Sequence, residues 1–172
     1  MGKSIIVFYS KSGENIANGT VVNLEVGNTE VAADMIAGFV EGADKFKIEM
    51  VKPYASGYMD CTAQAKLDQS TKARPEIKNA PESLDEYDTI YLGYPNYWGT
   101  MPMAMFTFLE KYDLSGKVIK PFCTHEGSGM GESINDLKEL APNAIIKEGL
   151  AIHGADVRGY KFTVKKWVNR ED

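Results

Sequence analysis

The order of segments along the chain predicts one α/β domain, a three-layer α/β/α sandwich built on a five-stranded parallel sheet. Five short apolar runs rich in β-branched and aromatic residues alternate with five segments of helical character. Such alternation places parallel strands in the middle of the fold and helices on both faces. The length of 172 residues suits one ordinary domain, so residues 1–172 are expected to form a single domain.

The five predicted strands differ in how deeply each should lie in the sheet. Ser4–Tyr9 and Thr89–Tyr94 are mostly apolar, which is typical of strands covered on both faces. Phe46–Val51 alternates apolar and polar residues and suits a position nearer an edge. The remaining two strands are predicted at Lys117–Cys123 and Ala144–Ile152.

Five helices are predicted between and after these strands. In the first, Val31, Met35 and Ile36 fall on one helical face. The predicted helices are Val31–Gly42, Asp60–Ala73, Pro102–Tyr112, Ser133–Leu140 and Ala155–Asn169. Parallel sheets of this kind bind ligands in the loops after the carboxyl ends of their strands, so those loops are the place to look for a site.

Charge and cysteine content bear on partners and location. The net charge of -5 argues against a nucleic-acid partner, whose phosphates would repel an acidic surface. Cys61 and Cys123 lack metal-ligand spacing, so no metal site is expected, and they suit reduced thiols in a cytoplasmic protein. No segment has the roughly 20 apolar residues of a membrane span, and no signal-peptide pattern is present.

The first loop is suited to holding a phosphate. It opens with Tyr9–Asn15 (YSKSGEN) and reaches the first helix at Gly27–Thr29 (GNT). Hydroxyls, backbone N–H groups and the positive end of a helix dipole attract an anion at such a turn. The Walker and dinucleotide glycine patterns are both absent. The alternative is that these residues only turn the chain and cap the helix.

The second loop, Pro95–Gly99, carries two adjacent aromatic residues after a buried strand. An isoalloxazine ring could stack on Tyr97 or Trp98, and amide groups near Asn96 could bond its polar edge. The alternative is that Tyr97 and Trp98 fold back into the core.

The third loop, Thr124–Gly131, is rich in glycine. Glycine lets the backbone approach a ligand closely and offers unencumbered N–H donors. For His125, a place on the loop surface is at least as good an interpretation as a catalytic role, and Glu126 could equally be a solvated charge. No arrangement for hydrolysis stands out, so catalytic residues are not assigned and cofactor chemistry fits better.

Four motifs in order resemble the flavodoxin family, and more closely its variant flavodoxin-4, over nearly the whole chain. They are YSKSGEN at Tyr9–Asn15, GNTE at Gly27–Glu30, GYPNYWGTMP at Gly93–Pro102 and THEGSGMGES at Thr124–Ser133. The resemblance implies the strand order 2-1-3-4-5 and FMN as the cofactor.

The resemblance also implies a role for each loop in holding FMN. The first loop would hold the phosphate, the second would line the ring and ribityl chain, and the third would contact the other edge of the ring. The predicted cofactor residues are Ser10, Lys11, Ser12, Asn15, Asn28, Thr29, Pro95, Asn96, Tyr97, Trp98, Thr124, His125, Glu126, Gly127 and Gly129.

One insertion departs from the family pattern. Ile16–Val26 separates the two halves of the phosphate loop, and Asn18-Gly19 within it is a turn signal between alternating segments. A small hairpin is therefore predicted, which would cover the cofactor or join a partner surface.

The predicted function is FMN-dependent electron transfer or oxidoreduction. The electron partner would be a redox protein or a small acceptor such as a quinone. One alternative is an NAD(P)H-dependent quinone or flavin reductase. Another is an interaction or regulatory module that binds no flavin.

Overall fold

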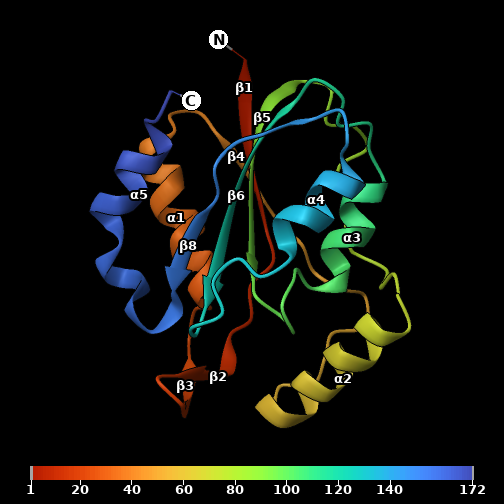
Figure 1. The fold of residues 1–172 in the computed structure, drawn as a ribbon, viewed down its shortest axis with the longest axis vertical. Coiled ribbons are helices and arrows are strands. Elements are labelled where there is room, and N and C mark those ends of the chain that lie inside the picture. Colours follow the sequence, from red (N-terminus) through yellow and green to blue (C-terminus); the bar gives the residue numbers. More distant parts are fainter. Residues whose placement is uncertain (1, 172) are drawn as a thin grey trace.

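The structure, a computed structural model, describes residues 2–171. One parallel sheet runs in the order β4-β1-β5-β6, and two short strands, β7 and β8, both pair with β6 (Figure 1). The strands are β1 (Lys3–Phe8), β4 (Asp44–Lys47), β5 (Tyr87–Pro95), β6 (Val118–His125), β7 (Ile145–Ile146) and β8 (Leu150–His153). With β7 and β8 taken as one interrupted strand, this is the predicted order 2-1-3-4-5.

Helices cover both faces of the sheet, which confirms the three-layer prediction. α1 and α5 lie on one face and α3 and α4 on the other, while α2 projects past the carboxyl end of the strands (Figure 1). The helices are α1 (Asn28–Phe39), α2 (Tyr58–Ser70), α3 (Met103–Glu110), α4 (Ser133–Leu140) and α5 (Lys161–Val168), with a 3₁₀ helix, η1 (Gly154–Gly159), before α5.

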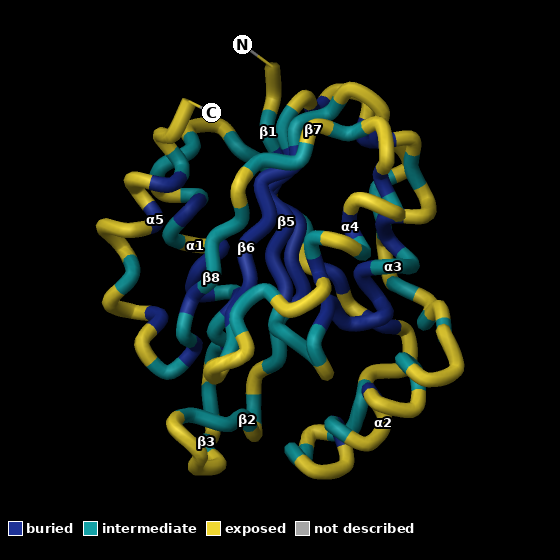
Figure 2. The backbone as a smooth tube through the Cα atoms, in the orientation of Figure 1, coloured by how far each residue is buried: buried dark blue, intermediate teal, exposed yellow. Residues whose placement is uncertain are grey.

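Two hydrophobic cores lie on opposite faces of the sheet. Successive side chains of a strand point to opposite faces, so Ile5 joins one core and Ile6 the other. The first core packs under α3 through Phe108, and the second under α1 and α5 through Ile36 and Trp167. The central strands are accordingly the most deeply buried part of the chain (Figure 2).

The predicted last strand, Ala144–Ile152, is interrupted, and Pro121 on β6 explains why. The carbonyl of Ile119 accepts a hydrogen bond from Lys147 N–H over 2.9 Å, so Ile119 faces the last strand. Two residues further on, Pro121 faces the same side but has no N–H to donate. The ladder therefore breaks between β7 and β8.

Most other elements are shifted by one to three residues from the sequence prediction, and two further differences have a clear cause. The edge strand is Asp44–Lys47 rather than Phe46–Val51, because Met50 leaves the sheet and pairs with Ile77 in an isolated bridge. The last helix divides into η1 and α5 near Gly159, a residue of low helix propensity.

The predicted hairpin in the inserted segment is confirmed. β2 (Gly13–Ala17) pairs antiparallel with β3 (Thr20–Leu24). Asn18 and Gly19 both have positive φ, at 51° and 81°, as a tight two-residue hairpin turn requires. The hairpin and α2 both project beyond the carboxyl end of the sheet (Figure 1).

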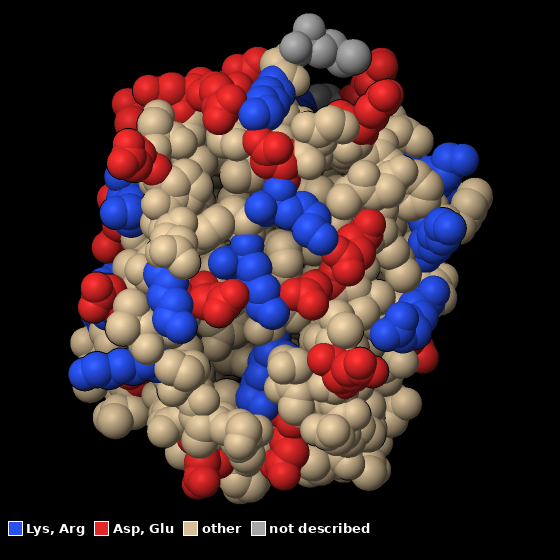
Figure 3. All heavy atoms as spheres, turned by 180° about the vertical axis from the view of Figure 1, so that it is seen from behind, with Lys and Arg blue, Asp and Glu red and all other residues tan. Residues whose placement is uncertain are grey.

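Charged side chains of both signs alternate over the face seen from behind (Figure 3). Ion pairs account for part of this mixture, among them Lys47 with Glu30 at 3.0 Å and Lys3 with Asp44 at 2.8 Å. Within residues 2–171, no helix combines the length and apolar character needed to cross a membrane. The same residues contain no cluster of side chains suited to a metal ion.

Candidate functional site

A cavity of about 500 Å³ opens at the carboxyl ends of the strands. Its walls come from the three loops singled out in the sequence, from β2 and from α2. The predicted residues that line it are Lys11, Asn15, Asn28, Thr29, Pro95, Asn96, Tyr97, Trp98, Thr124, His125 and Glu126. The structure thus brings together residues that lie more than 100 positions apart in the chain.

Four predicted residues do not line this cavity. Ser10 and Ser12 line a neighbouring cavity of about 320 Å³, which shares Lys11 and Cys61 with the first. Gly127 and Gly129 lie in the third loop, where Ser128 between them reaches the cavity instead.

The amino end of α1 closes one end of the cavity. The N-cap residue Gly27 has no side chain to cap this helix, and the N–H groups of Asn28 and Thr29 have no acceptor among the described residues. Gly27 is required just before it, because a Cβ there would lie 2.2 Å from Ser10 Oγ. Free N–H donors and the helix dipole make this end suited to an anion.

Ser10 and Thr29 support the helix end rather than point freely into the cavity. The hydroxyl of Ser10 accepts a hydrogen bond from Glu30 N–H over 3.1 Å. The buried hydroxyl of Thr29 lies 2.7 Å from that of Thr124 and joins the first loop to the third. The carboxylate of Glu30 pairs with Lys47 and does not line the cavity.

Lys11 and Asn15 are held by backbone carbonyls of the first loop and of the segment before α2. Lys11 Nζ donates to the carbonyls of Glu14 (2.7 Å) and Ser56 (3.0 Å), and Asn15 Nδ2 donates to the carbonyl of Lys11 (2.9 Å). Both side chains fix the hairpin, and the positive charge of Lys11 still lies in the cavity wall.

Tyr97 and Trp98 occupy different environments at the other end of the cavity. Tyr97 is partly buried, packs edge-on against Tyr9 at 5.8 Å between centroids, and burial raises the pKa of its hydroxyl well above the ordinary value. That hydroxyl is the only buried side-chain polar atom of the described residues without a normal hydrogen-bond partner. Trp98 is 53% exposed and lines the cavity mouth.

Asn96 is used to hold two loops together. Its Nδ2 donates to the carbonyl of Gly129 over 2.9 Å, and its Oδ1 accepts from the N–H of Gly99 over 2.9 Å. The second and third loops therefore form one unit, and the Asn96 amide supports the site rather than being free for a ligand.

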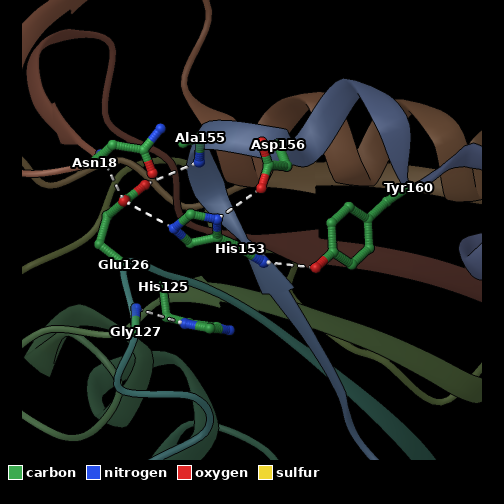
Figure 4. A network of polar contacts seen from close by, with 8 residues as sticks. All are labelled: Asn18, His125, Glu126, Gly127, His153, Ala155, Asp156 and Tyr160. Atoms are coloured by element: carbon green, nitrogen blue, oxygen red, sulfur yellow. Dashed lines mark hydrogen bonds and ion pairs between the residues drawn. The ribbon is translucent and has the colours of Figure 1, made fainter.

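The third loop carries a polar network at the α1 end of the cavity (Figure 4). His125 Nδ1 accepts a hydrogen bond from Gly127 N–H, and burial lowers the pKa of His125. Glu126 accepts hydrogen bonds from the N–H groups of Asn18 (3.0 Å) and Ala155 (2.9 Å). Glu126 is thus a bonded member of the site, not merely a solvated charge.

Sequence reasoning missed the wall that α2 provides. Tyr58, Met59, Cys61, Thr62 and Ala65 line the cavity along this helix, and Ile16, Ser128 and Gly154 complete the lining. Burial raises the pKa of the Cys61 thiol. The sequence did contain one signal. α2 is largely polar, yet Tyr58, Met59 and Cys61 at its start are apolar, and no core residues were predicted for them to cover.

The cavity suits an elongated ligand with an anion at one end and an aromatic ring at the other. Its volume lies in the range of about 300–1,000 Å³ that is usual for cofactor sites. The free N–H groups of α1 suit a phosphate, and the Tyr97–Trp98 wall suits a flat ring. The residues present therefore fit FMN.

A doubly wound α/β domain with such a cavity at the strand ends has the arrangement in which proteins of this fold class bind nucleotide cofactors. The chain belongs to the flavodoxin family, whose model matches residues 3–171. This confirms the resemblance seen in the sequence, and it supports the predicted cofactor, FMN.

Solved structures agree with this assignment. A candidate flavoprotein from Bacteroides uniformis is 28% identical, with a TM-score of 0.78 over 98% of this chain and 99% of that one. A second from Bacteroides eggerthii is 27% identical, with a TM-score of 0.72 over 95% and 98%. A flavoprotein from Lactobacillus acidophilus in complex with FMN shares the fold at 20% identity, with a TM-score of 0.65 over 93% and 99%. No curated protein matches the chain.

Proposed function

We propose that this protein binds FMN non-covalently in the 500 Å³ cavity and serves in electron transfer. The observation that carries the proposal is the cavity itself, which joins the free N–H groups at the amino end of α1 to the aromatic wall of the second loop. FMN, when bound, supplies the capacity to accept and release electrons.

The protein's own residues bind and orient that cofactor. The N–H groups of Asn28 and Thr29 attract the phosphate, and the Lys11 ammonium adds positive charge nearby. Tyr97 and Trp98 cover the ring, while α2 and the hairpin exclude water from the two sides. Thr124 and Ser128 line the wall contributed by the third loop.

A second candidate function is an NAD(P)H-dependent quinone or flavin reductase. The neighbouring 320 Å³ cavity favours it, because Lys11 and Cys61 form a wall common to both cavities. A second ligand there would lie next to the cofactor. A module that binds no flavin has no comparable use for the aromatic wall and the free N–H groups of α1.

The two flavin functions are separated by mixing the FMN-loaded protein with NADPH in the absence of oxygen. Rapid bleaching of the flavin absorbance is expected of a reductase. A carrier stays oxidised until a partner reductase is added. Protein that neither carries flavin when purified nor quenches the fluorescence of added FMN would contradict both functions.

The cysteines bear on location. Cys61 and Cys123 are both free and buried, and burial raises the pKa of Cys123 to about 12. Unpaired buried thiols suit a reducing compartment, and on that ground we propose a cytoplasmic location.

A further inference from the structure

Glu126 is an unexpected residue at the end of the cavity proposed for a phosphate. It lines the cavity together with Asn28, and both lie against Gly154. A Cβ at Gly154 would be 2.7 Å from Asn28 Nδ2 and 3.1 Å from Glu126 Oε1. An uncompensated carboxylate in this position would repel a phosphate dianion.

His153 places a positive charge beside this carboxylate and shares it with Asp156. Its Nε2 lies 3.1 Å from Glu126 Oε2 and its Nδ1 lies 2.8 Å from Asp156 Oδ2, so the ring stands between two carboxylates (Figure 4). A neutral imidazole donates from one nitrogen only, whereas the imidazolium donates from both. The geometry therefore selects the protonated ring.

The same carboxylate fastens the inserted hairpin. Glu126 accepts a hydrogen bond from the N–H of Asn18 at the hairpin turn and another from Ala155 at the start of η1. Asn15 and Ile16 of that hairpin line the cavity. The charge on Glu126 thus cannot be removed without loosening a wall of the site.

We propose that His153 is a positioning residue for the cofactor phosphate: its imidazolium offsets the negative charge of Glu126, while Glu126 holds the hairpin in place. This inference rests on the proposed binding of FMN. It predicts that the affinity for a phosphorylated flavin depends on the protonation of a side chain outside the cavity lining.

The groups around His153 fix the direction of that dependence. Glu126, Asp156, His125 and the Tyr160 hydroxyl are the titratable groups that face it. Hydrogen bonding to Asp156, together with the charge of Glu126, raises the pKa of His153. His125 has a lowered pKa, so it stays neutral while His153 loses its proton as the pH rises.

The test compares FMN with riboflavin, which lacks the phosphate, by fluorescence titration of the full chain and of His153→Gln. Between about pH 7 and pH 9 the phosphate of FMN is already largely dianionic, so its own titration contributes little. The affinity of the wild-type protein for FMN is expected to fall by about tenfold as the pH rises through the raised pKa of His153, an ordinary coupling between two sites. Riboflavin affinity should change little, and His153→Gln should bind FMN weakly at both pH values.

A second measurement needs no variant. The chain has two histidines, so their ring signals in an NMR titration are easily followed. Because linkage is reciprocal, FMN should raise the pKa of His153 and riboflavin should not. An equal fall in affinity for the two flavins, or an unchanged His153 titration on adding FMN, would overturn the inference and leave FMN binding intact. Failure of both flavins to bind at any pH would overturn the proposed function, and this inference with it.

Discussion

The indole N–H of Trp98 donates a hydrogen bond to the carbonyl oxygen of Thr62 over 2.9 Å. This bond ties the second loop to α2 across the mouth of the cavity. Lys66, one turn further along α2, places its ammonium 5.0 Å from the centre of the indole ring. Trp98 adopts a positive φ of 54°, which is uncommon for an aromatic residue, in a tight turn closed by backbone hydrogen bonds between Tyr97 and Thr100.

Trp98→Ala should weaken FMN binding by roughly 1–3 kcal/mol, the range found for base-like stacking on an aromatic residue. Trp98→Phe keeps a ring but loses the bond to Thr62, so its loss of affinity should be smaller. Fluorescence titration with FMN measures both. Phe162→Ala serves as the matched control, because Phe162 is a 72% exposed aromatic on α5 outside the cavity. Equal affinity of Trp98→Ala and wild type would remove Trp98 from the site.

Gly27→Ala should damage the amino end of α1. The added Cβ would meet Ser10 Oγ at 2.2 Å and the Lys11 carbonyl oxygen at 2.6 Å, so the loop must shift. We expect a loss of about 1–3 kcal/mol in unfolding free energy, as for overpacking, together with weaker FMN binding. Urea unfolding and FMN titration measure the two effects.

Gly38→Ala is the control for that change, since it lies on the same helix with nothing within 4 Å of the added Cβ. It should stabilise the protein by about 0.5–1 kcal/mol through helix propensity and leave FMN affinity unchanged. If Gly27→Ala and Gly38→Ala had the same stability and the same FMN affinity, the close approach at Gly27 would be unimportant for the site.

Tyr97→Phe removes a hydroxyl that is buried without a normal hydrogen bond. The Tyr9 hydroxyl and the Cys61 thiol are its polar neighbours, but neither is placed for a bond of normal geometry. Because an unsatisfied buried hydroxyl costs about 1–3 kcal/mol, the variant without cofactor should be more stable than wild type by about 1 kcal/mol. Thermal or urea unfolding of the cofactor-free protein checks this, and a destabilised variant would mean that the hydroxyl has a partner in solution.

The stability contributed by His153 should depend on pH. Its pKa is raised in the folded protein, so its stabilisation is fully present below the ordinary value near 6.5 and is lost as the pH rises through the folded value. The difference in unfolding free energy between wild type and His153→Gln should therefore be largest at about pH 6 and shrink toward pH 9. A difference that stays constant, or grows with pH, would show that the ring is not an imidazolium in the network.

Hydrophobic patterning predicted the three layers, whereas the strand order was predicted only through the resemblance to the flavodoxin family. The turn at Asn18-Gly19 was also predictable, since few residues other than these accept positive φ. The break in the last strand depends on which side of β6 Pro121 faces, and that is known only once the neighbouring register is known. Local patterns do not contain that information.

Only part of the candidate site could be predicted from the sequence. Loops after strands converge by topology, so Asn28, Tyr97 and Thr124 could be expected to meet. The wall from α2 could not, because the place of that helix is fixed by tertiary hydrogen bonds such as those from Tyr58 N–H to the Glu14 carboxylate and from the Trp98 indole to the Thr62 carbonyl. The contact of His153 with Glu126 could not be predicted either, because no local motif around these two residues indicates that they meet.

A crystal structure of the protein grown with excess FMN tests the central claim most directly. We expect one flavin per chain, with its phosphate on the N–H groups of Asn28 and Thr29 and its ring against Tyr97 and Trp98. A flavin seated elsewhere on the chain, or a 500 Å³ cavity that holds only water in the presence of excess FMN, would contradict the account.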